Sequence, residues 1–132
     1  MKHGSPIAFI GGGNMARSLV GGLLARGTPK DAIRVSDPIP ASREALHHDF
    51  GIETYEGNAD AVRGAPTWVF AVKPQVMRAV CQALAPIAQD ARPLVVSIAA
   101  GITSSQLEQW LGGGIAVVRC MPNTPALLGA GV

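Results

Sequence analysis

Three consecutive glycines, Gly11–Gly13, lie between two segments of different periodicity, and they constrain the fold of this chain more than any other feature. The preceding residues, Pro6–Ile10, form a short apolar run that predicts a buried strand. The following residues, Asn14–Arg26, place apolar side chains at helical spacing, and Gly27 supplies a C-terminal stop. The sequence therefore predicts a strand, a tight glycine turn and a helix.

The same alternation of strand and helix continues along the chain. Further strands are predicted over residues 32–36, 52–55, 67–72, 94–98 and 115–119, and helices over 42–49, 74 to about 85, where Pro86 is expected to end the helix, and 104–111. Near-continuous apolar strands that alternate with helices are typical of a parallel sheet covered on both faces. We therefore expect an α/β, Rossmann-like, doubly wound and mainly parallel sheet of about six strands, in one domain over residues 1–132.

Composition excludes several classes of protein. Of the 132 residues, 48% are apolar and 15% are charged, which excludes a disordered chain. The net charge is only +2 and no basic cluster occurs, so no nucleic-acid partner is expected. No apolar stretch is long enough for a membrane span. The two cysteines, Cys81 and Cys120, match no metal spacing and are interpreted as reduced, buried thiols of a cytoplasmic protein.

Residues Gly11–Ala16 fit the pattern G-x-G-x-x-A of a dinucleotide-binding turn. Gly11 permits the tight turn, Gly13 has no side chain to obstruct a pyrophosphate, and Ala16 is small enough for the helix to pack closely on the strand. The helix N-terminus would then present free N–H groups to the phosphates. A glycine turn with a purely structural role is the alternative interpretation.

Asp37 follows this motif by about 20 residues and closes the second predicted strand. A carboxylate there can accept hydrogen bonds from both hydroxyls of an adenosine ribose, which favours NAD and would repel the 2′-phosphate of NADP. Ser36 and Arg43 lie nearby and could hold a phosphate instead. Alternatively, Asp37 only starts a turn with Pro38.

The ends of the later strands carry small or polar residues suited to a ligand. Ala71–Pro74 and Ile98–Gly101 leave space for a flat group, and Lys73 could pair with an anion or lie exposed at a turn. Asn123 and Thr124 carry donors and acceptors suited to an amide or a carboxylate, or they cap a turn between two prolines. No metal cluster or hydrolase motif is present in the sequence, the adjacent His47 and His48 are expected on the surface, and Trp68 and Trp110 are expected in the core.

Four segments together, residues 10–16, 71–74, 96–101 and 119–126, resemble pyrroline-5-carboxylate reductase in order and spacing, above all in Met121-Pro122-Asn123-Thr124-Pro125-Ala126. The resemblance implies an oxidoreductase that reduces 1-pyrroline-5-carboxylate to L-proline, the last step of proline biosynthesis, with NADP, or with NAD because of Asp37. It implies no metal. The cofactor-binding residues it implies are Ile10, Gly11, Gly12, Gly13, Asn14, Met15, Ser36, Asp37, Asn58, Ala71, Val72, Lys73, Pro74, Ile98, Ala99 and Ala100, with Asn123 and Thr124 facing the nicotinamide and the small-molecule substrate.

The resemblance covers only the N-terminal half of the family. Its members continue into a helical domain that forms the homo-oligomer and supplies most of the substrate pocket, including the hydroxyl residue that assists protonation. The catalytic residues are therefore expected in that part, and the 132-residue chain alone is expected to have little or no activity. Two alternatives stay open: a non-catalytic nucleotide-sensing module, and a dehydrogenase of the beta-hydroxyacid type.

Overall fold

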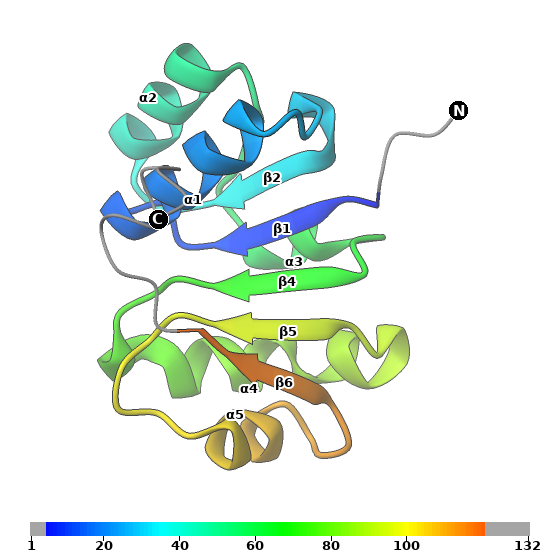
Figure 1. Ribbon diagram of the computed structural model, residues 1–132. Coiled ribbons are helices and arrows are strands. Elements are labelled where there is room, and N and C mark those ends of the chain that lie inside the picture. Colours follow the sequence, from blue (N-terminus) through cyan, green and yellow to red (C-terminus); the bar gives the residue numbers. More distant parts are fainter. Residues whose placement is uncertain (1–4, 121–132) are drawn as a thin grey trace.

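The computed structural model describes residues 5–120 and builds them around a parallel β-sheet (Figure 1). The strands are β1 (Ile7–Ile10), β2 (Ile33–Ser36), β3 (Glu53–Tyr55), β4 (Thr67–Phe70), β5 (Leu94–Ser97) and β6 (Ala116–Arg119). Every neighbouring pair is parallel, and the order across the sheet is β3-β2-β1-β4-β5-β6. The doubly wound sheet predicted from the sequence is confirmed.

The strand order changes direction at the centre of the sheet. The chain builds outward from β1 to β3 and then returns to the free side of β1 to place β4. All strands end on the same side of the molecule, so the carboxyl ends of β1 and β4 lie next to each other (Figure 1). In sheets of this kind, ligands bind in the crevice outside the strand ends at this reversal.

Helices cover the two faces of the sheet, and the sheet divides the core into two apolar clusters. They are α1 (Asn14–Ala25), α2 (Pro40–Phe50), α3 (Asn58–Val62), α4 (Pro74–Ala91) and α5 (Ser104–Trp110), with a short 3₁₀ turn over Lys30–Ala32. One cluster joins α1 and α2 to Phe9, Val35 and Val69 of the sheet. The other joins α4 and α5 to Trp68 and Phe70. Burial on both faces explains why the strands are almost entirely apolar.

Among the described residues, part of the face that α1 and α2 cover elsewhere is not covered by a helix over β5 and β6. Strand register pairs Leu94 with Ala116 and Val96 with Val118, so these four side chains point to that same face. In Figure 1 none of the described helices lies in front of β5 and β6. Leu94 is therefore 42% exposed and Val118 is 50% exposed, although both are large apolar residues. We call these four residues the β5–β6 face.

Two helices differ from the sequence expectation. The helix that begins at Pro74 does not end before Pro86 but continues to Ala91. Met77, Cys81, Leu84 and Ala88 form a buried stripe along it, whereas Pro86 is exposed, so packing stabilises the helix on both sides of the proline. The short helix α3 was not predicted, because five residues show no usable helical period.

The histidines and tryptophans lie as expected, but one cysteine does not. His47 and His48 are exposed, Trp68 is fully buried, and Trp110 packs against the core. The prediction of two buried thiols is wrong for Cys120, which is exposed just after the edge strand β6. The described residues contain no group of side chains able to hold a metal ion. No helix among them is long and apolar enough to cross a membrane.

The two thiols should therefore differ in reactivity. Burial shields Cys81 and raises its pKa to about 12, so almost no thiolate exists near neutral pH. We expect a disulfide reagent at pH 8 to modify Cys120 rapidly and Cys81 only after unfolding by denaturant. Cys120→Ser should abolish the rapid phase and Cys81→Ser should leave it intact. A rapid phase that persists in Cys120→Ser would contradict the buried position of Cys81.

Candidate functional site

The glycine turn begins with a close approach between two backbones. Gly11 follows β1 with a φ of 103°, a conformation that favours glycine. A Cβ atom at this position would lie 2.8 Å from the carbonyl oxygen of Ala71, which follows β4. The Gly11 N–H donates to the Ser36 carbonyl at 2.9 Å, and the Ala71 N–H donates to the Ile10 carbonyl at 2.8 Å. Gly11 thus connects the ends of β2, β1 and β4.

The next two glycines have opposite surroundings. Gly12 is buried, and a Cβ atom there would lie 2.9 Å from Cδ1 of Leu46. Gly13 is exposed, and a Cβ atom there would have no heavy atom within 4 Å. A side chain at Gly12 would thus press on buried neighbouring side chains, whereas the space beside Gly13 is open to a ligand.

The N-terminus of α1 faces this open space without a side-chain cap. Gly13 is its N-cap residue, and among the described residues no side-chain hydrogen bond caps the helix. The first bond of the helix runs from the Arg17 N–H to the Gly13 carbonyl at 2.9 Å, so the N–H groups of Asn14, Met15 and Ala16 precede it. Such amides and the positive end of the helix dipole favour an anion.

Asp37 lies behind the turn and is bonded to the backbone on both sides. Its Oδ2 accepts from the Gly12 N–H at 2.9 Å, and its Oδ1 accepts from the Ile39 N–H at 2.8 Å. Only 8% of the residue is exposed. The bond to Ile39 is the local turn considered as an alternative from the sequence, and the bond to Gly12 was not anticipated.

Three further polar residues predicted to contact the cofactor or its phosphate, Ser36, Arg43 and Asn58, form hydrogen bonds at the end of β2. Ser36 is buried at the end of β2, and its hydroxyl donates to Oδ1 of Asn58 at 2.6 Å. Asn58 is the first residue of α3. Arg43 donates from Nη1 to the carbonyl oxygen of Asp37 at 2.8 Å. The structure therefore brings Ser36, Asp37, Arg43 and Asn58 together around the carboxyl end of β2.

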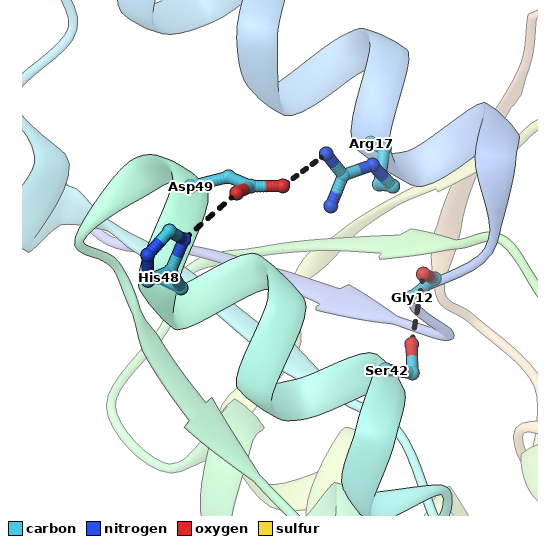
Figure 2. A network of polar contacts seen from close by, with 5 residues as sticks. All are labelled: Gly12, Arg17, Ser42, His48 and Asp49. Atoms are coloured by element: carbon cyan, nitrogen blue, oxygen red, sulfur yellow. Dashed lines mark hydrogen bonds and ion pairs between the residues drawn. The ribbon is translucent and has the colours of Figure 1, made fainter.

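Ser42 is a contact of the turn that the sequence analysis missed. It lies in the first turn of α2, and its hydroxyl donates to the Gly12 carbonyl at 3.2 Å (Figure 2). Gly12 is therefore held through its N–H by Asp37 and through its carbonyl by Ser42. The only available signal was a hydroxyl residue five positions after Asp37, which by itself indicates nothing.

A second polar network ties α1 to α2 on the surface. Arg17 donates to Oδ2 of Asp49 at 2.7 Å, and Nδ1 of His48 lies 3.1 Å from Oδ1 of the same carboxylate (Figure 2). These hydrogen bonds, that of His48 first and that of Arg17 second, lower the pKa of Asp49 below its usual value. The Arg17 guanidinium also lies 5.0 Å from the centroid of the Phe50 ring. Through Arg17, this network joins α1 to the C-terminal end of α2.

A shallow pocket of about 250 Å³ opens beside the turn, at the carboxyl ends of β4 and β5. It is lined by Met15, Ala71, Val72, Lys73, Pro74, Ile98, Ala99 and Ala100. All except Met15 are residues predicted to line the nicotinamide half of the site, and Met15 was predicted to belong to the turn that holds the pyrophosphate. Lys73 is the single ionisable residue among them, and it is exposed. The pocket can therefore hold a flat, mostly apolar group, but its lining offers no buried acid. Asn123 and Thr124 lie outside the described residues.

Comparison with protein families places the chain among oxidoreductases. Residues 6–101 match the model of the family described as NADP oxidoreductase, coenzyme F420-dependent. A pyrroline-5-carboxylate reductase of Pseudomonas aeruginosa is 58% identical over 125 residues, which are 95% of this chain and 45% of the relative. That of Escherichia coli is 41% identical over 128 residues, 96% of this chain and 47% of the relative. The chain thus spans slightly less than half the length of these relatives.

Solved structures with the same fold include two enzymes of the same name. A pyrroline-5-carboxylate reductase of Coxiella burnetii superposes with a TM-score of 0.90 at 39% identity, over 94% of this chain and 46% of that one. A pyrroline carboxylate reductase of Plasmodium falciparum, solved with NADP bound, superposes with a TM-score of 0.82 at 25% identity, over 98% of this chain and 46% of that one. The similarity extends over almost the whole of this chain.

The different surroundings of Gly11 and Gly13 give a stability test. We expect Gly11→Ala to lower the free energy of unfolding by about 2 kcal/mol or more, because the new Cβ meets backbone atoms and the positive φ disfavours alanine. Gly13→Ala should lower it by about 1 kcal/mol or less, since the position is open and extended and the only cost is that alanine is a poorer N-cap residue than glycine. Urea unfolding followed by circular dichroism measures both. Equal stability of the two variants would contradict the close approach at Ala71.

Proposed function

The chain belongs to the NADP oxidoreductase family whose model matches residues 6–101, and we propose that it is the cofactor-binding part of a pyrroline-5-carboxylate reductase. The observation that carries this proposal is the open glycine turn: the uncapped N-terminus of α1 and the pocket of small residues adjoin one space at the reversal of strand order. The complete enzyme would reduce 1-pyrroline-5-carboxylate to L-proline, the last step of proline biosynthesis.

The residues present fit a nicotinamide dinucleotide. The turn from Ile10 to Met15 would hold the pyrophosphate, because the space beside Gly13 is open and the first amides of α1 are unpaired within the helix. The pocket over Ala71–Pro74 and Ile98–Ala100 would hold the nicotinamide half. When bound in its reduced form, the cofactor supplies a hydride. The chain's own residues orient the ring and exclude water from one side of it.

We infer that the cofactor is NADP, with NAD as the alternative that Asp37 suggested from the sequence. The bound NADP of the Plasmodium falciparum relative supports this choice. So does Arg43, whose guanidinium is held at the end of β2 by the Asp37 carbonyl and brings a positive charge to the place where this fold binds the adenosine ribose.

The catalytic residues and the substrate pocket are proposed to lie in the half of the relatives that this chain does not match. We propose that this half is a helical domain that forms the homo-oligomer, and that it covers the β5–β6 face. The support is geometric: Leu94 and Val118 are apolar and exposed on a face that is covered by helices over β1 and β2. The described residues then form the NAD(P)-binding domain.

A fluorescence titration with NADPH and NADH tests the binding proposal. We expect saturable binding of both, tighter for NADPH, and a loss of at least about tenfold in affinity in Gly13→Ala, because the new methyl group enters the phosphate space. Gly21→Ala is the matched control: it lies within α1, and its Cβ would meet only the Phe50 ring at 3.7 Å or more. Absence of binding in the folded chain would refute the proposal, and tighter NADH would refute the NADP assignment.

An activity measurement tests whether the catalytic residues lie in this chain or in the half of the relatives that it does not match. With 1-pyrroline-5-carboxylate and NADPH at saturating concentration, the 132-residue chain should oxidise NADPH no faster than a blank without enzyme. The reason is that its pocket holds a flat group but offers no buried acid for the substrate. Robust turnover by the chain alone would show that the catalytic residues lie within it.

A further inference from the structure

The Asp37 carboxylate is the one buried acidic group among the described residues, and its two oxygens are both bonded to main-chain amides. Oδ2 accepts from Gly12 in the glycine turn, and Oδ1 accepts from Ile39 in the turn that precedes α2. The two turns belong to adjacent parts of the proposed cofactor site, the pyrophosphate region and the adenosine end. A single carboxylate thus bridges them.

The environment of this carboxylate leaves little of it for a ligand. Only 8% of the residue is exposed, and charged acceptors bonded to N–H groups are held firmly where water is excluded. A Cβ atom added at Gly12 would lie 3.1 Å from Oδ2 of Asp37. The Gly12 carbonyl in turn accepts a hydrogen bond from Ser42. Movement of Asp37 toward a ribose would break the bond to Gly12 and expose a buried amide.

Resting on the proposed function, we propose that Asp37 is a positioning residue that locks the glycine turn to the β2–α2 turn, and that its carboxylate does not choose between NADH and NADPH. The Gly12 N–H then donates its hydrogen bond to Asp37 and is not available to a cofactor. The donors left for a pyrophosphate are those of Gly13 and the first turn of α1. An acidic residue at this position is therefore compatible with NADP.

The proposal and a ribose-binding role differ in their consequences for Asp37→Asn. An asparagine has one acceptor oxygen and one NH₂ group, so one of the two backbone N–H groups must face a donor. A positioning role predicts weaker binding of both cofactors by the same factor, because the turn that serves both is loosened. A ribose-binding role predicts weaker NADH and equal or tighter NADPH, because the repulsion of the 2′-phosphate disappears.

The test combines cofactor titrations with amide hydrogen exchange of Gly12, followed by NMR without cofactor. For Asp37→Asn we expect Gly12 to exchange at least about tenfold faster, and the ratio of the two dissociation constants to stay within about twofold. Asp31→Asn, an exposed acid in the 3₁₀ turn, removes the same charge and should change neither. A shift of the ratio by about tenfold toward NADPH with unchanged Gly12 exchange would overturn the proposal.

Hydrogen exchange in the unaltered chain tests the Asp37 bridge even if the variant does not fold or the cofactors do not bind. If Asp37→Asn does not fold, exchange in the unaltered chain decides: Gly12 and Ile39 amides protected without cofactor support the bridge, and rapid exchange of Gly12 refutes it. If neither cofactor binds the unaltered chain, the proposed function fails, whereas the exchange of Gly12 still reports on the bridge independently.

Discussion

The close approach of Gly11 to the Ala71 carbonyl is the contact on which the arrangement of the site depends. No side chain fits between the two backbones, and the positive φ of Gly11 turns the chain sharply at the end of β1. The Ala71 N–H bonds to the Ile10 carbonyl, so the pairing of β1 with β4 continues one residue beyond the end of β4. As a result, the turn that starts α1 and the loop that starts α4 lie against the same space, and Met15 and Lys73 line one pocket.

Most of the fold could be read from periodicity, because a parallel sheet buried on both faces leaves an apolar run for every strand. Local rules failed where packing outweighed them. Pro86 lies on the exposed side of α4 while Leu84 and Ala88 hold the helix to the core on either side, and no sequence window contains that information. Cys120 follows the edge strand β6, and the sequence does not say that this strand is an edge.

The site was predictable where it is made of backbone and not where it is made of long-range hydrogen bonds. Glycine spacing indicated the turn, and small residues after β4 and β5 indicated the pocket. The acidic position at Asp37 was found, but its partner Gly12 lies 25 residues away in sequence, and a carboxylate has the same pattern whether it faces a ribose or an amide. Ser42 escaped notice for the same reason.

The register of β1 also makes the glycine turn depend on a distant part of the chain. Ile7 pairs with Ile33 on one side and with Thr67 on the other, and the second pairing closes much the longer loop. Longer loops are somewhat costlier in entropy to close, and this pairing needs the chain as far as Thr67. The close approach of Gly11 to the Ala71 carbonyl therefore forms only when β4 is paired with β1. The shape of the glycine turn therefore depends on β4 as much as on the glycines themselves, although the two lie about 60 residues apart in the chain.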